Sequence, residues 1–216
     1  ANAHTGFNFT MTLIWLPMIA VLVNIVMRIV PDKKEEYILS SGASRYLDEK
    51  IINQPTAALH LVSKEVLRCG HMVEEMLAKV YELSEKNETL LLSEIKKDAA
   101  AVRELYVSIN DYLNTMFSEG VMTEDQAGQS TRLMYILCDV DRIGALCNEI
   151  TTSIIDPGTS NVKLSKEATK DLKKSVKLIH DMYQYAMDTL ASGNSNHIKN
   201  IQKKKDEVLL LDDNMR

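Results

Sequence analysis

The hydrophobic and polar positions divide the chain into two kinds of sequence. From Phe7 to Met27 there are 21 consecutive residues without a formal charge, whereas after Pro55 apolar residues recur at steps of three and four. At about 1.5 Å rise per residue, such an uncharged run spans the roughly 30 Å hydrocarbon core of a bilayer. The spacing of three and four is that of one face of an α-helix. We therefore predict a transmembrane helix in residues 1–30 and an all-α region over residues 55–216.

The all-α region divides into five predicted helices. Their apolar stripes run from Leu59 to Leu83, Leu91 to Met116, Leu133 to Ile150, Leu172 to Leu190 and Ile198 to Leu211. Gly120 and Gly193 are helix-ending signals, Asn87 is a predicted cap, and Thr123 with Gln126 forms a capping-box signature. Because the connections are short, we expect neighbouring helices to be antiparallel, with each apolar stripe in the core of a helical bundle.

The segment between the two regions is predicted to be a linker. Residues 31–54 are charged and polar, with Ser40, Ser41 and Gly42 near the centre. This composition favours a connection with at most a short turn of helix.

Composition narrows the classes of function. The chain has 25 Lys and Arg against 30 Asp and Glu, for a formal net charge of -5. Nucleic acid is not an expected partner, because a dense basic patch is missing. Cys69, Cys138 and Cys147 form no CxxC pair and fall within apolar helical patterns, which favours reduced core thiols in a cytosolic compartment.

The charges around the apolar run predict its orientation. Arg28, Lys33 and Lys34 follow the run, whereas His4 is the one ionisable side chain before it. The positive-inside rule therefore places the residues after 31 in the cytoplasm, and a secretory signal peptide would need a basic stretch before the run. The alternative is a core helix of a soluble bundle, although such helices usually have a charged face. Because Ala1 opens directly before the span, we expect a fragment of a longer protein.

Two stretches resemble a known family in the expected order. The opening ANAHTGFNFTMTLIWLP, through Ala3, His4, Phe7, Asn8 and Pro17, resembles a segment near the end of the membrane part of sodium-dependent phosphate (Na/Pi) cotransporters. Residues 47–77 are similar to the junction where bacterial members carry a fused PhoU-like helical domain. The resemblance implies that residues 55–216 are PhoU-like, with one full three-helix repeat and part of a second.

The acidic motifs of PhoU-like domains also have counterparts. Glu94 and Asp98 match the pattern of a carboxylate, three residues and an aspartate, which places both on one helix face. The run DVDRIG resembles a second family motif and keeps Asp141, but Ala145 stands where the next carboxylate belongs. The resemblance implies a divalent or ferric metal ion near Glu94, Asp98 and Asp141. The alternative is a solvated helix face.

Three residues at the start are candidates for the transport path. His4 and Asn8 lie four apart on one predicted helix face, and Phe7 adjoins them. The resemblance favours a role in translocation, because polar groups inside a span are costly unless partnered. The alternative is that His4 and Asn8 cap the helix and bind the headgroup region.

We expect sodium-dependent transport of inorganic phosphate across the inner or plasma membrane, with sodium as coupling ion and the cytosolic bundle as regulatory domain. A second hypothesis is a membrane-anchored adaptor that binds itself or other proteins and transports nothing, and a third is a metal-storing bundle. HExxH, P-loop, GxGxxG and GxSxG motifs are all missing from the sequence, so an enzyme is not expected.

Overall fold

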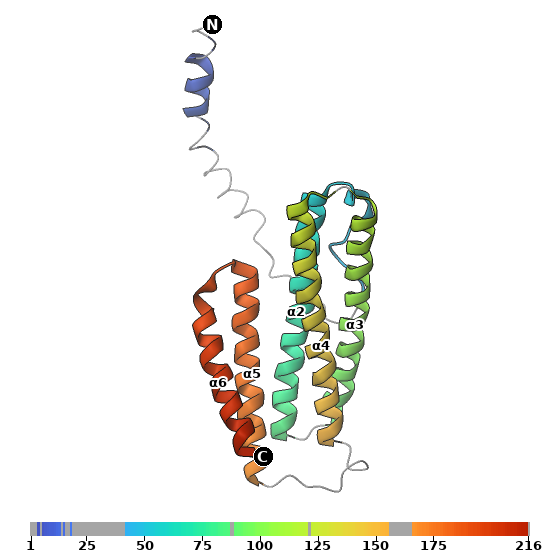
Figure 1. Cartoon of the computed structure of the whole chain (residues 1–216), viewed down its shortest axis with the longest axis vertical. Coiled ribbons are helices and arrows are strands. Elements are labelled where there is room, and N and C mark those ends of the chain that lie inside the picture. The colour runs from blue at the N-terminus through green and yellow to red at the C-terminus, as the bar shows by residue number, and fades with distance from the viewer. Residues whose placement is uncertain are drawn as a thin grey trace. The chain divides into compact units, whose positions relative to one another are not determined.

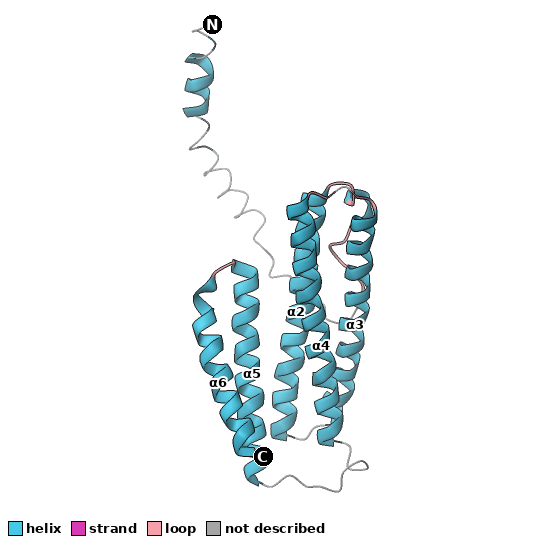
Figure 2. Cartoon of the chain, in the orientation of Figure 1, coloured by secondary structure: helices cyan, strands magenta, loops and turns pink. Residues whose placement is uncertain are grey.

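The protein is described from a computed structural model, which covers residues 4, 6–13, 15, 18, 42–86, 89–120, 122–155 and 166–215. The regular secondary structure in these ranges is helical throughout (Figure 2). The chain separates into two units, residues 1–38 and residues 39–216. The predicted all-α class is confirmed for the described part of the chain.

Five long helices form the framework of the second unit (Figure 1). They are α2 (Pro55–Lys86), α3 (Thr89–Ser118), α4 (Glu124–Ile155), α5 (Lys166–Ser192) and α6 (Ile198–Met215), with the short 3-10 helices η1 (Glu49–Ile51) and η2 (Ser195–His197). Each of the five predicted apolar stripes lies within one of these helices. The predicted cap Asn87 lies outside the described residues.

Helices α2, α3 and α4 run side by side in alternating directions and all contact one another (Figure 1). The predicted stripe of α2 is buried along its whole length: Leu59, Val62, Val66, Cys69, Val73, Met76, Leu77, Val80 and Leu83 are each at most 5% exposed. Removing such side chains from water stabilises each by about 1.5–3 kcal/mol. This apolar stripe is therefore the centre of the three-helix core.

The end of α3 and the start of α4 have the glycine and the capping box that the sequence predicts. Gly120 ends α3 with φ of 63°, a left-handed conformation that costs glycine little. At the start of α4, Thr123 N donates to Gln126 Oε1 over 2.9 Å, and Gln126 N donates to Thr123 Oγ1 over 3.4 Å. The capping box is confirmed.

Helix α5 attaches to α2, and α6 in turn packs on α5. The buried Tyr183 hydroxyl of α5 donates to the carbonyl oxygen of Gly70 in α2 over 3.0 Å. Lys204 Nζ of α6 lies 2.7 Å from Asp181 Oδ2 of α5, and this hydrogen bond raises the pKa of Lys204. One buried tyrosine and one ion pair thus help to join the two last helices to the bundle.

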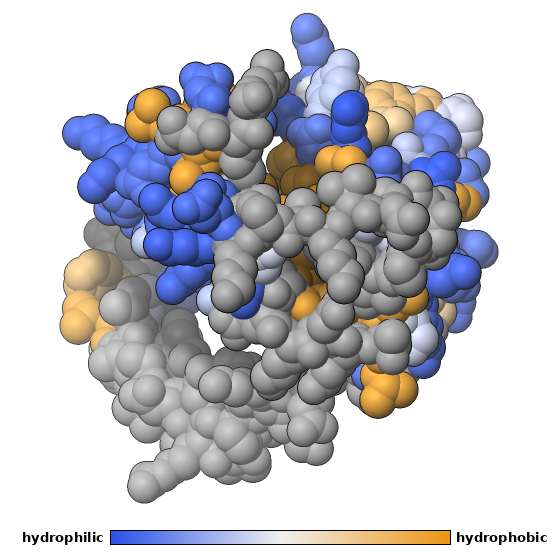
Figure 3. All heavy atoms as spheres, turned by 90° about the horizontal axis from the view of Figure 1, so that it is seen from below, coloured by the Kyte–Doolittle hydropathy of each residue, from blue (hydrophilic) through white to orange (hydrophobic). Residues whose placement is uncertain are grey.

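The prediction that each apolar stripe lies in the core is wrong for several residues. Leu146, Ile150, Ile179 and Ile198 are 37–46% exposed, and Cys138 is exposed as well. In the described part of the chain, α4 contacts α2 and α3, while α5 contacts α2 and α6, so parts of their surfaces have no helix against them. Seen from below, the described surface is mostly hydrophilic with separate hydrophobic patches (Figure 3).

Candidate functional site

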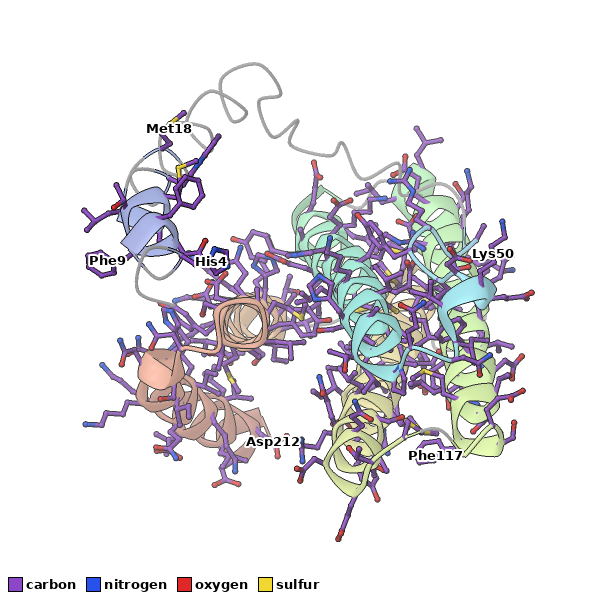
Figure 4. The ribbon with its side chains drawn as sticks, turned by 90° about the horizontal axis from the view of Figure 1, so that it is seen from above. His4, Phe9, Met18, Lys50, Phe117 and Asp212 are labelled. Carbon is purple, nitrogen blue, oxygen red and sulfur yellow. The ribbon has the colours of Figure 1, made fainter. Side chains whose placement is uncertain are left out.

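The predicted transport-path residues lie in the first unit. Residues 6–13 are helical, and the side chains of Thr10 and Thr12 donate to the carbonyl oxygens four residues earlier. Asn8 Nδ2 lies 3.5 Å from His4 Nε2, so the predicted shared helix face is confirmed. Phe7 is 60% exposed, and Figure 4 shows where His4 and Phe9 project from this helix. A role of His4, Phe7 and Asn8 in translocation stays a prediction.

The structure describes only part of the predicted membrane span. Among the residues that the structure describes, none of the helices is both long and apolar enough to cross a bilayer. Much of the predicted run, including Pro17 and residues 19–27, lies outside the described residues. The transmembrane helix therefore stays a prediction.

The predicted metal ligands Glu94 and Asp98 meet at a lysine. Lys79 of α2 places its ammonium nitrogen 2.6 Å from Asp98 Oδ2 and 3.2 Å from Glu94 Oε2 of α3. Burial acts to lower the pKa of Lys79, but the hydrogen bonds and charges of Asp98 and Glu94 outweigh it and raise the pKa. The two carboxylates do share one face, as predicted, and a protonated side chain lies against them.

The third predicted ligand points to a different partner. Asp141 Oδ2 of α4 accepts from Arg103 Nη1 of α3 over 2.7 Å. Within the described ranges, groups of three or more His, Cys, Asp or Glu side chains that could hold a metal ion do not occur. The structure thus brings Glu94 and Asp98 together and pairs Asp141 elsewhere, and the metal site stays a prediction.

A cluster that the sequence did not predict lies at the opposite part of α2. Glu65 and Arg68 form an ion pair with side chains 0% and 2% exposed, and Arg68 Nε donates to Glu65 Oε1 over 2.6 Å. Isolated charges are expensive to bury, so both need further partners. These partners come from the segment before α2.

Residues 42–48, which we call the strap, supply those partners. Glu65 Oε2 accepts from the backbone N–H groups of Arg45 and Tyr46 at 3.2 and 2.8 Å. Arg68 Nη2 donates to the carbonyl oxygen of Ala43 over 2.7 Å. The ion pair is therefore a clamp, because its remaining hydrogen bonds hold the backbone of the strap.

Helix α3 holds both ends of the strap. At its far end, the Tyr112 hydroxyl donates to the carbonyl oxygen of Asp48 over 2.8 Å. At its start, Gly42 is buried, and a Cβ there would come within 2.6 Å of the carbonyl oxygen of Ala101 and of Glu104 Cβ. The described part of the predicted linker thus packs against the bundle, with Leu47 and Ile52 against its core.

The sequence does contain a signal for the clamp. Glu65 and Arg68 lie three apart, between the apolar stripe positions Val62 and Cys69. A charged pair at this place in a helix would occupy the buried face, which requires a partner for each charge. The backbone groups that meet this requirement lie 19 to 25 residues away and carry no signal of their own.

The sequence of the three-helix bundle is similar to that of known proteins. Residues 66–154, which form most of α2 and nearly all of α3 and α4, match the family described as PhoU domain. The "Putative inorganic phosphate export protein YjbB" of Salmonella typhimurium is 23% identical over 212 residues, and that of Escherichia coli K12 is 21% identical over 209 residues.

These matches cover 96% of this chain but 38% of each relative, so the chain spans about two fifths of the length of the curated relatives. No solved structure matches significantly. The three-helix bundle, with its buried core and the expected acidic positions on α3, is the part that the family match covers. Residues 66–154 of this chain are therefore similar to the PhoU domain family.

Proposed function

We propose that the chain belongs to a membrane protein that moves inorganic phosphate, and that its helical bundle regulates this movement from the cytoplasm. The match to the PhoU domain family and the names of the relatives support a phosphate-related role. The resemblance of the opening segment to Na/Pi cotransporters supports sodium as coupling ion. The exposed polar surface of the bundle suits contact with water on the cytoplasmic side (Figure 3).

The observation that carries the regulatory part of this proposal is the clamp. A regulatory domain has to pass its conformational state to the part that it regulates. The strap directly follows residues 1–41 in the chain, and Glu65 and Arg68 of α2 bind three of its backbone groups. A shift of α2 relative to α3 would therefore displace the backbone that leads to the N-terminal unit.

The test is phosphate flux in sealed vesicles that contain the full-length parent protein. Labelled phosphate is followed in both directions, with an imposed sodium gradient and with potassium in its place. We expect flux that needs sodium. Flux that persists without sodium would remove sodium as coupling ion, and the direction of net flux would decide between uptake and export.

A matched pair of glycine substitutions tests regulation through the strap. In Gly42→Ala, the new Cβ meets backbone and side-chain atoms of α3, whereas in the control Gly128→Ala the nearest atom is Arg132 Nη1 at 3.6 Å. We expect Gly42→Ala to change the sodium-driven flux about fivefold or more, the range of ordinary allosteric coupling. Gly128→Ala should leave the flux unchanged. Equal flux in both variants would contradict regulation through the strap.

An adaptor that transports nothing is the second candidate, and the exposed apolar positions of α4 favour it. Tyr135 and Leu146 are 70% and 44% exposed, and exposed apolar side chains are common in protein interfaces. Folded full-length protein without phosphate flux under any gradient would reject the transporter and leave the adaptor.

A further inference from the structure

The most specific polar contact outside the clamp is the meeting of two carboxylates at one ammonium. Asp98 Oδ2 and Glu94 Oε2 lie 2.6 and 3.2 Å from Lys79 Nζ. The Asp98 and Lys79 side chains are 15% and 25% exposed, whereas Glu94 is 55% exposed. Lys79 and Asp98 form the inner, partly buried contact, and Glu94 closes the outer side.

The core fixes this meeting point. Val80 and Ile95 follow Lys79 and Glu94 directly in the chain and are 1% and 0% exposed. Because α2 and α3 are packed through these apolar side chains, the backbone positions of the three charged residues are set by the core. The ammonium therefore lies between the carboxylates as a consequence of helix packing.

The other charged groups near Glu94 and Asp98 do not take the position of the Lys79 ammonium. Glu75 lies one turn before Lys79, and its pKa is raised. Burial is the largest cause; the charge of Lys79 acts against it and the charge of Asp98 adds to it. Lys96 and Lys97 on α3 are exposed. Asp141, the third predicted metal ligand, pairs with Arg103 instead. The surroundings are acidic, and Lys79 is the cation in contact with both carboxylates of the motif in the described structure.

Metal binding would have to displace this cation. Ligand oxygens lie about 2.0–2.6 Å from Mg²⁺ or Ca²⁺, so an ion shared by Glu94 and Asp98 would take the place now held by the ammonium. The Lys79 ammonium and a metal ion cannot both occupy that place. At such a short distance their mutual repulsion is stronger than the attraction that the two carboxylates provide. The carboxylate pair as it stands therefore does not fit a metal ion.

We propose that the ammonium of Lys79 is the resident cation of the Glu94 and Asp98 pair, so that this helical bundle is complete without a metal ion at that motif. A metal ion can bind there once the ammonium has been removed. This inference is independent of whether the parent protein transports phosphate.

The experiment uses the 216-residue chain, purified in detergent without chelator, and measures metal content by mass spectrometry and the thermal midpoint by circular dichroism. The wild type, Lys79→Ala and the control Lys97→Ala are compared with EDTA and with millimolar Mn²⁺. Lys97→Ala removes the same charge from an exposed place on α3. The double variant Lys79→Ala/Asp98→Asn removes the inner carboxylate as well.

We expect the wild type to be metal-free, with a thermal midpoint that neither EDTA nor Mn²⁺ changes. Lys79→Ala should lower the midpoint by about 2–6 °C, because two carboxylates then lack their counter-ion. Mn²⁺ should restore at least half of this loss by binding the folded state, and should not do so in the double variant. Lys97→Ala should behave like the wild type.

Two results would overturn the proposal. One is wild-type protein that carries about one metal ion per chain and loses it, together with thermal stability, in Glu94→Gln/Asp98→Asn. The other is Lys79→Ala that is as stable as the wild type or gains nothing from Mn²⁺, since the ammonium would then not occupy a cation site.

Discussion

The hydroxyl of Tyr183 donates a hydrogen bond of 3.0 Å to the main-chain carbonyl oxygen of Gly70, which ties α5 to the middle of α2. Tyr183 is 8% exposed, and burial raises the pKa of its hydroxyl far above its ordinary value. The helical Gly70 leaves space beside α2 that the Met187 side chain fills. A polar contact and an apolar contact thus meet at one place between α2 and α5.

Removal of this hydroxyl should loosen α5 and α6 from the bundle. We expect Tyr183→Phe to lower the free energy of unfolding by about 1–2 kcal/mol, because a buried acceptor loses its side-chain donor. Hydrogen exchange of the α5 and α6 amides should become faster, while exchange in α3 should not change. Tyr135→Phe is the control, since Tyr135 is 70% exposed. Uniformly faster exchange in all helices would contradict a local role for the contact.

The clamp should respond differently to single and double substitutions. Arg68→Met leaves the Glu65 carboxylate buried without its ion-pair partner, which should cost about 3–5 kcal/mol. In Glu65→Leu/Arg68→Met both charges are gone, so the loss should be smaller than in the single variant. Urea titration followed by circular dichroism measures both values. A double variant as unstable as the sum of its two single variants would mean that the pair is not coupled.

The tight approach at Gly144 offers a test of helix packing. A Cβ at this position of α4 would lie 3.3 Å from Val102 Cγ1 and 3.3 Å from Val73 Cγ2, so α4 passes close to both neighbours here. Gly144→Ala should destabilise the bundle by about 1–2 kcal/mol, in the range of other overpacked cores. Gly128→Ala, on the open side of the same helix, should be neutral or stabilise by up to about 1 kcal/mol. In thermal melts the midpoint of Gly144→Ala should fall below that of the wild type, and the midpoint of Gly128→Ala should not.

The cysteines should divide into one reactive and two protected thiols. Cys138 is exposed, while burial raises the pKa of Cys69 and of Cys147 from 9.0 to about 12. A maleimide should label one thiol per folded chain at neutral pH and three in urea. Labelling of Cys69 or Cys147 in the folded protein would contradict their burial.

The same pKa shifts predict a loss of stability in alkaline solution. The folded state holds the Cys69 and Cys147 thiols protonated, so their contribution to stability is complete below pH 9. It is lost as the pH rises toward about 12, because the unfolded chain releases these protons first. Cys69→Ala/Cys147→Ala should therefore show a shallower fall of stability above pH 9 than the wild type. Parallel pH profiles for both proteins would reject this cause.

The helices could be predicted from the sequence because their signals are local. The apolar spacing from Leu59 to Leu83, the left-handed Gly120 and the capping box at Thr123 each depend on residues within one or two turns. Exposure was predicted less well. Ile179 and Leu146 have the right spacing, but whether another helix covers them depends on the tertiary arrangement.

The candidate sites show the same division. The shared face of Glu94 and Asp98 follows from helical spacing, whereas the approach of Lys79 depends on how α2 packs against α3. The strap was predicted as a linker because polar residues without periodicity resemble a connection. Its order comes from hydrogen bonds to Glu65 and Arg68, which sequence spacing does not reveal.

The strap also changes where a minimal folding unit of this protein should begin. A recombinant bundle that starts at Pro55, the first residue of α2, would keep the Glu65 carboxylate but lose the two N–H groups that Arg45 and Tyr46 donate to it. The Arg68 guanidinium would lose the carbonyl oxygen of Ala43 at the same time. In such a fragment the Glu65 and Arg68 side chains, which are buried in the longer chain, would be exposed to water. The bundle would then tend to open or aggregate. The smallest fragment with a self-sufficient interior therefore starts no later than Gly42.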